Sequence, residues 1–216
     1  MKSSLHIALL MLILMACRTP QLVIAYKNPN LPEHVYSRIV VTAMLQCGND
    51  SFRRQIEQRV VGEMLQRGLP AVAIADEFPE GRQAAGDITE TYRQLCLRGV
   101  DAVVTVALIE GSRENQPLSG VLATHPNDYY FERVWNYPQI LAHCPSDSPP
   151  SSHTYYWEVI LFDLATLEAQ CAVQTRSFTV ADSLHLNRDF ESRVIRRLVK
   201  ERVLIQVNRS TAKPGF

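Results

Sequence analysis

Two helix-ending signals that recur in the first half of the chain constrain its fold most. Arg67-Gly68 and Arg98-Gly99 each follow apolar residues at helical spacing, and each is followed by an apolar run. Glycine favours the left-handed backbone that closes a helix. The pattern predicts a strand at 38–45, a helix from Asp50 or Ser51 to Gly68, a strand at 71–75, a helix from Asp87 to Gly99 and a strand at 100–109. Right-handed crossovers between them give a parallel βαβαβ sheet.

The second half of the chain has a different pattern. Two strand-like runs at 155–163 and 168–178 are separated by the short segment LATL, which predicts an antiparallel hairpin. A final helix is expected over 187–206, with Phe190, Val194 and Leu198 on one face. Its basic residues are typical of a solvated face, with a contact to lipid headgroups as the second interpretation. We therefore expect an α/β fold: one mixed-sheet domain with a βαβαβ first half, then an antiparallel hairpin and a C-terminal helix.

A long segment from Glu110 to Thr154 separates the two halves and contains few periodic signals. A stretch of this length inside a compact domain is usually functional or mobile. It carries an aromatic cluster: Tyr129, Tyr130, Phe131, Trp135 and Tyr137. Rigid aromatic side chains beside prolines are suited to contact with a protein or a glycan. The alternative is a hydrophobic plug that folds the segment back onto the sheet.

The N-terminus has the features of an export signal. Lys2 precedes an uncharged, mostly apolar stretch from Leu5 to Ala16, which is too short to span a membrane and has the length of a secretory h-region. The residues Leu-Met-Ala-Cys at 14–17 resemble the lipobox of bacterial lipoproteins, which implies cleavage before Cys17 and lipid attachment to that cysteine. The alternative is a plain signal peptide with a cysteine near the cut.

These signals divide the chain into four parts. We expect a lipoprotein signal peptide at 1–16, a tether at 17–36, a single α/β domain at 37–207 and a C-terminal tail at 208–216. Within the tether, the apolar piece from Leu22 to Tyr26 could add an edge strand. Because Arg18 rather than Asp follows Cys17, we expect the outer membrane rather than the inner membrane.

The charge balance argues against a nucleic-acid partner. Twenty-two Lys and Arg stand against 22 Asp and Glu, so the formal net charge is +0. A chain with no excess of positive charge has no electrostatic field that attracts a polyanion.

A search for catalytic signatures gives mostly negative results. Hydrolase, metalloprotease, nucleotide-binding and dinucleotide-binding motifs are absent from the sequence. His125, His143, Cys144 and His153 lie in the middle segment, but their spacing matches no metal-ligand pattern, so no metal or other cofactor is expected. Glu158 stands in an apolar strand, where burial could raise its pKa; the alternative is a paired or edge-exposed strand carboxylate.

Several other charged residues and the cysteines have ordinary structural interpretations. Arg53 and Arg54 could bind an anion at the start of the first helix, but an i, i+4 pair of Arg53 with Glu57 accounts for one of them. Cys47, Cys96, Cys144 and Cys171 are even in number in an exported chain, which allows disulfides. Cys96 and Cys171 stand at apolar positions, where buried free thiols are equally expected.

The elements taken together are similar to a group of bacterial envelope lipoproteins of unknown function. The matching pieces are RIVVTAML at 38–45, the helix with Arg53, Arg54 and Glu57, GLPAVAI at 68–74, GVDAVVTVALI at 99–109, WEVILFD at 157–163 and QTRSF at 174–178. Distant similarity extends to the amino-terminal domain of the translocation protein TolB and to curli-secretion lipoproteins. Where such lipoproteins often have Trp in the later hairpin strand, this chain has Cys171.

The resemblance and the missing catalytic motifs lead to one main expectation. We expect a non-enzymatic lipoprotein, attached to the bacterial envelope through Cys17, that contacts other envelope proteins through the aromatic cluster. The alternatives are a small-molecule or glycan binder that uses the same cluster, and a hydrolase centred on Glu158 or a histidine.

Overall fold

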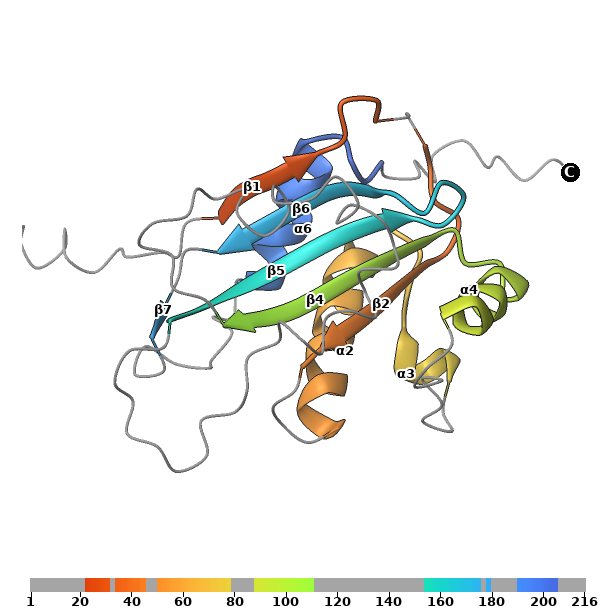
Figure 1. Ribbon diagram of the computed structural model, residues 1–216, viewed down its shortest axis with the longest axis horizontal. Coiled ribbons are helices and arrows are strands. Elements are labelled where there is room, and N and C mark those ends of the chain that lie inside the picture. Colours follow the sequence, from red (N-terminus) through yellow and green to blue (C-terminus); the bar gives the residue numbers. More distant parts are fainter. Residues whose placement is uncertain are drawn as a thin grey trace, which may run out of the picture.

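The computed structural model describes residues 22–31, 34–45, 50–78, 88–110, 154–175, 178–179 and 190–205. Figure 1 shows their arrangement around one mixed sheet of seven strands. The strand order is β1-β6-β5-β4-β2-β3, and β7 pairs with β5. The expected α/β class, with a mixed sheet in one domain, is confirmed.

The parallel half of the sheet follows the predicted order. Its elements are β2 (Ile39–Met44), α2 (Asp50–Gln66), β3 (Ala71–Ala73), α3 (Ile74–Glu77), α4 (Ile88–Leu97) and β4 (Ala102–Glu110). β2 pairs in parallel with both β3 and β4. The strand expected at 71–75 was too long, because α3 begins at Ile74. Asp76 and Glu77 stand in its first turn, where acidic residues favour a helix.

Both predicted glycine signals close their helices. Gly68 and Gly99 have φ angles of 72° and 71°. In each case the chain turns back to bond the last helical turn: Leu69 N donates to Met64 O at 3.0 Å, and Val100 N donates to Leu95 O at 3.1 Å. Each glycine therefore turns the chain directly from a helix into the next buried strand.

The antiparallel half contains β5 (Thr154–Asp163), β6 (Ala169–Thr175), β7 (Phe178–Thr179), α6 (Phe190–Lys200) and β1 (Leu22–Lys27). The predicted hairpin is confirmed, and Asp163 Oδ1 accepts the Ala165 N–H at 2.8 Å and the Thr166 N–H at 3.0 Å in its turn. The second strand ends earlier than expected, since Phe178 and Thr179 pair with β5 as β7.

The final helix is also shorter than predicted. It ends at Lys200 rather than near residue 206, because Arg202 adopts a left-handed conformation with φ of 59°. Val203 N then donates to Leu198 O at 3.0 Å, which folds the chain back and buries Val203 and Leu204. Sequence periodicity continued past this point because those two residues are apolar.

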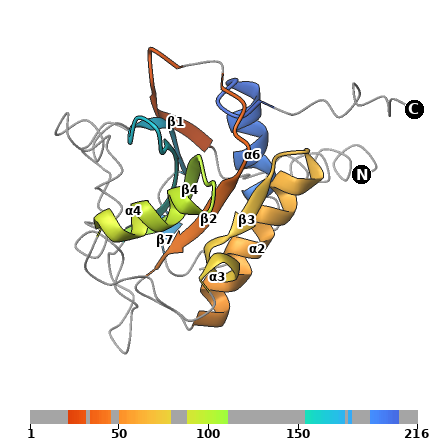
Figure 2. The same cartoon turned by 90° about the vertical axis from the view of Figure 1, so that its right-hand side faces the viewer.

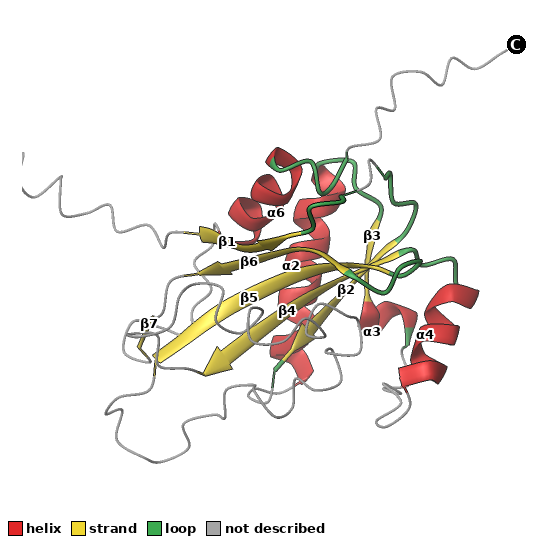
Figure 3. Ribbon diagram, turned by 45° about the horizontal axis from the view of Figure 1, so that its top comes forward, coloured by secondary structure: helices red, strands yellow, loops and turns green. Residues whose placement is uncertain are grey.

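The core lies on both faces of the sheet. Figure 2 shows α2 and α6 on one side of it, which we call the helix-pair face, and α4 on the other, which we call the α4 face. Alternate strand residues supply the two layers, with Val104 and Val159 on the helix-pair face and Val103 and Ile160 on the α4 face. Figure 3 shows α6 and α2 next to each other on the same side of the sheet.

In the part of the chain that the structure describes, no helix is long and apolar enough to cross a membrane.

Candidate functional site

The candidate site is the edge strand β1, because it is the part of the described domain that is closest in sequence to Cys17. Residues 22–27, which the sequence placed in the tether, form this strand, as the apolar piece from Leu22 to Tyr26 suggested. β1 pairs with β6 from Leu22 opposite Thr175 to Lys27 opposite Cys171. Leu22 and Ile24 pack on the helix-pair face, so the strand contributes to the core.

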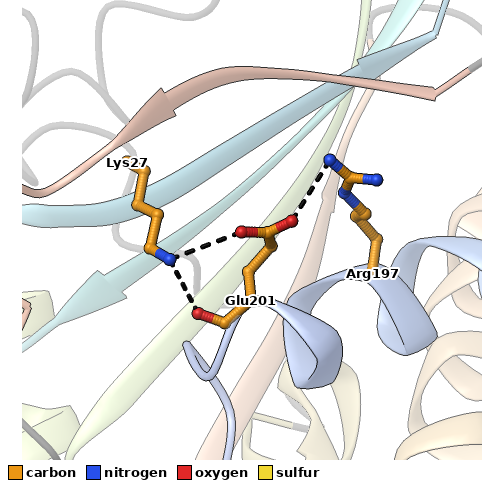
Figure 4. Close-up of polar contacts among 3 residues, drawn as sticks. All are labelled: Lys27, Arg197 and Glu201. Atoms are coloured by element: carbon orange, nitrogen blue, oxygen red, sulfur yellow. Dashed lines mark hydrogen bonds and ion pairs between the residues drawn. The ribbon is translucent and has the colours of Figure 1, made fainter.

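The end of β1 is attached to the end of α6 (Figure 4). Lys27 Nζ donates to Glu201 O at 2.9 Å, and it lies 3.4 Å from the Glu201 carboxylate. The same carboxylate pairs with Arg197 at 3.1 Å. A cation at a helix C-terminus is favourable because the last carbonyl groups carry partial negative charge. Lys27 therefore joins the first strand to the last helix.

A turn directly after β1 fixes where the strand ends. Asn28 N donates to Gln170 O at 2.9 Å, and Asn28 Nδ2 donates to Gln170 Oε1 at 3.4 Å. Asn28 Oδ1 accepts the Asn30 N–H at 2.9 Å, a pattern in which an asparagine side chain closes a turn. β1 is therefore held along its length by β6 and at its end by α6 and Asn28.

Glu158 lies on the α4 face of β5 and is 0% exposed. Gln174 on β6 stands directly opposite, and its Nε2 donates to Glu158 Oε2 at 2.6 Å. Thr42 and Thr105, which are also buried, stand opposite each other on the same face. Of the alternatives that the sequence left open, the geometry matches the paired strand carboxylate and not the edge-exposed one, because β5 lies inside the sheet.

Further buried carboxylates were not anticipated, and the two least exposed of them are Glu57 and Glu191. Glu57 on α2 is 0% exposed, and its Oε1 accepts the Ala43 N–H at 3.0 Å. Burial raises the pKa of Glu57, although the Ala43 N–H and the charge of Arg53 partly oppose the rise. Arg53 forms an ion pair with Asp50 at 3.2 Å, and its positive charge also acts on the Glu57 carboxylate one turn further along α2. Arg54 is exposed.

The second buried carboxylate, Glu191, joins the two helices of the helix-pair face. Its side chain is 2% exposed and lies 2.9 Å from Arg59 Nε on α2. Burial raises the pKa of Glu191, and the Arg59 guanidinium opposes that rise. Glu191 stands in the first turn of α6, and its partner Arg59 lies 132 positions away in sequence. The pairing of Glu191 with Arg59 becomes apparent only from the packing of α6 against α2.

The remaining predicted residues divide into two groups. Cys17, the whole aromatic cluster, Cys47, and the set of His125, His143, Cys144 and His153 lie outside the described residues. Cys171 is buried and free, and burial raises its pKa to about 12, as expected of an inert core thiol. The expectation that Cys96 is buried was wrong: it is a free but exposed thiol on the outer side of α4. No group of metal-binding side chains occurs among the described residues.

Comparisons with known proteins give matches of structure only. No protein-family model matches the sequence, and no curated protein matches it. The chain is similar to the PelC dodecamer from Paraburkholderia phytofirmans, with a TM-score of 0.42 and 9% identity over 87% of this chain and 100% of that one. It is also similar to lipoprotein GNA1162 from Neisseria meningitidis, with a TM-score of 0.39 and 12% identity over 76% of this chain and 96% of that one. Both matches are similarities of fold, and function must be inferred from the residues of this chain.

Proposed function

We propose that the protein is a lipid-anchored bacterial envelope lipoprotein, without catalytic activity, that acts as an interaction or assembly module. The observation that carries the proposal is the Leu-Met-Ala-Cys motif at 14–17, placed five positions before a strand that belongs to the sheet. A lipid on Cys17 is thereby connected to the folded domain by a very short piece of chain. At about 3.4 Å per residue, that piece reaches at most about 17 Å.

The buried polar groups support a structural rather than a catalytic domain. Glu158 is paired with Gln174, Glu191 with Arg59, and Glu57 with the Ala43 N–H. Each of these contacts joins two elements of the fold. A general acid or base must instead reach a reacting group on the substrate. The described carboxylates most shielded from water are thus engaged in holding strands and helices together.

Lipid attachment is tested by metabolic labelling with radioactive palmitate in a bacterial host. We expect label in the full-length protein and none in Cys17→Ala. Cys96→Ala is the matched control, because Cys96 is an exposed thiol and its loss leaves the lipobox intact. Equal labelling of the wild type and Cys17→Ala would exclude the lipoprotein assignment.

The interaction role is tested by crosslinking intact envelopes and purifying the protein with its partners. We expect a crosslinked envelope protein that is lost when Tyr129, Tyr130 and Trp135 are replaced together by Ala, since aromatic side chains dominate most protein interfaces. Leu97→Ala is the control, because Leu97 is an apolar side chain that is 68% exposed on α4. Unchanged crosslinking in the triple variant would remove the aromatic cluster as the contact surface.

A further inference from the structure

The outer side of α6 carries a row of positive charges. Arg193, Arg196, Arg197 and Lys200 are spaced at i, i+3, i+4 and i+7, which places them on one side of the helix. The opposite side, with Phe190, Val194, Leu198 and their neighbours, is buried against the sheet. We call the four cationic residues the basic stripe; it extends over about 10 Å along the helix.

Among the residues that the structure describes, few acidic groups lie beside Arg196 and Lys200 of this stripe. Glu191 on the same helix is buried and paired with Arg59, and Glu201 pairs with Arg197 and Lys27. Arg196 and Lys200 are exposed and form no ion pair with any residue that the structure describes. The outer surface of α6 is therefore locally positive although the whole chain has a net charge of +0.

The stripe lies beside the strand that follows Cys17. α6 begins against Trp157, where the Phe190 ring lies 6.0 Å from the Trp157 ring, and it ends beside Lys27 of β1 (Figure 4). The reach of about 17 Å between Cys17 and Leu22 exceeds the diameter of one helix, about 10–12 Å. A bilayer that holds the lipid of Cys17 can thus touch the outer side of α6 without displacing β1.

We propose that the basic stripe of α6 binds anionic lipid headgroups of the bilayer that holds the lipid of Cys17, so that the helix-pair face lies towards the membrane and the α4 face away from it. This inference rests on the proposed lipid attachment. Charges spread along a convex helix suit a charged surface better than one small anion, and cationic side chains beside a lipid anchor commonly supply its second membrane contact. The short connection also keeps headgroups at high local concentration around the stripe.

The orientation can be measured on the full lipidated chain in vesicles, with one fluorescent thiol label at a time. A variant with Cys47→Ser and Cys144→Ser is labelled at native Cys96, on the α4 face. A second variant adds Cys96→Ser and Gln58→Cys, which moves the label to an exposed position of α2 on the helix-pair face and leaves the basic stripe intact. Cys171 is 0% exposed and has a raised pKa, so it does not react. Lipids with a nitroxide on the headgroup quench labels that lie near the bilayer surface.

In vesicles rich in phosphatidylglycerol, we expect at least about twofold more quenching at position 58 than at Cys96. The difference should shrink in phosphatidylcholine vesicles and at high salt, because salt screens exposed charges. Adding Lys200→Gln should reduce it further, and Lys200→Arg, which keeps the charge, should restore it. Both substitutions concern an exposed side chain, so folding is preserved.

Equal quenching at the two labels, or a difference that is the same in neutral vesicles, would overturn the orientation while leaving lipid attachment intact. Flotation of the same samples separates the two proposals. A protein that carries no lipid and fails to float with vesicles contradicts the proposed function itself, whereas a protein that floats without the charge-dependent difference contradicts only the role of the basic stripe.

Discussion

The two halves of the sheet are held together in different ways. In the parallel half, β2, β3 and β4 come from one stretch of chain, and glycines with left-handed φ angles direct each helix into the next strand. In the antiparallel half, β1 pairs with β6, from the opposite end of the chain. Lys27 reaches Glu201 across 174 positions, and Arg59 reaches Glu191 across 132.

This difference separates local from long-range determinants of the fold. Turn residues and apolar spacing suffice to specify the parallel half and the hairpin of β5 and β6, whereas the places of β1 and α6 depend on contacts that form only when distant segments meet. The proposed lipid on Cys17 is connected to the domain through β1, a strand that is held in place by such long-range contacts. The attachment of β1 should therefore respond to substitutions in α2 and α6 that leave the glycine turns unaffected.

The largest expected effect comes from breaking the ion pair between α2 and α6. Arg59→Ala leaves the Glu191 carboxylate, which is 2% exposed, without its cation. A buried charge that loses its partner destabilises a protein strongly; since Arg59 itself is 35% exposed, we expect a loss of about 2 kcal/mol in the free energy of unfolding at neutral pH. Urea denaturation measures the loss.

Arg93→Ala is the control for Arg59→Ala. Arg93 also pairs with a glutamate, Glu90 at 2.7 Å, but both side chains are exposed on α4. Such surface pairs contribute little, so this variant should unfold at nearly the wild-type urea concentration. If Arg59→Ala were as harmless as Arg93→Ala, the ion pair would not hold the antiparallel half in place.

A smaller effect is expected from the glycine turn of the parallel half. Gly99→Ala forces a side chain into a left-handed backbone, although no atom lies within 4 Å of the added Cβ. The loss should be about 1 kcal/mol, from conformation alone. Gly62→Ala should change the free energy of unfolding in the opposite direction. Gly62 lies inside α2, where alanine favours the helix more than glycine does, and no atom lies within 4 Å of its added Cβ. There we expect a gain of about 0.5–1 kcal/mol.

Thermal or urea unfolding of these two variants tests whether local geometry governs the parallel half. A loss in both variants would mean that the space around the glycines, and not their backbone angles, decides the outcome. A gain in both would show that the turn at Gly99 tolerates a side chain, and the local account of this half would then be wrong.

The contrast between the halves also explains which features were predictable from sequence. Gly68, Gly99 and the LATL turn act through the backbone of neighbouring residues, so their positions can be read from the residues around them. The premature end of α6 was missed because Arg202 takes a conformation typical of glycine, which its residue type does not signal.

The candidate site was only partly predictable for the same reason. The sequence suggested an edge strand at 22–26, which the structure confirms, but it gave no sign that Lys27 would contact Glu201. It also placed Cys96 in the core, whereas the helix directs Leu95 inward and Cys96 outward. Apolar character alone does not fix which side of a helix faces the sheet at adjacent positions.

The contact between β1 and α6 should give a modest effect. Lys27→Ala removes the hydrogen bond to Glu201 O and the pair with its carboxylate. Because Lys27 is 40% exposed, water replaces much of the lost interaction, and we expect a loss of about 0.5 kcal/mol. Hydrogen exchange should show faster opening of β1, while exchange in β2 and β4 stays as in the wild type. Uniformly faster exchange would contradict a local attachment.

The last prediction concerns an exception within the parallel half. Glu57 is a buried carboxylate that joins α2 to Ala43 of β2, and burial raises its pKa above the value in the unfolded chain. The folded protein therefore binds this proton more tightly than the unfolded chain does. Its contribution to stability is greatest below the unfolded pKa and decreases as pH rises towards the folded pKa.

Glu57→Gln, which is neutral at every pH, should remove this decrease, so that its free energy of unfolding changes less with pH above about 4.5 than that of the wild type. Glu90→Gln is the opposite control. Hydrogen bonds from Arg93 and Gln94 lower the pKa of the wild-type Glu90 carboxylate to about 2, so this exposed group contributes a small stability that is lost as pH falls towards that value. If the free energy of unfolding of Glu57→Gln depended on pH as strongly as that of the wild type, the Ala43 N–H and Arg53 would fully compensate the effect of burial on the pKa of Glu57. Glu57 would then be no exception to the local control of the parallel half.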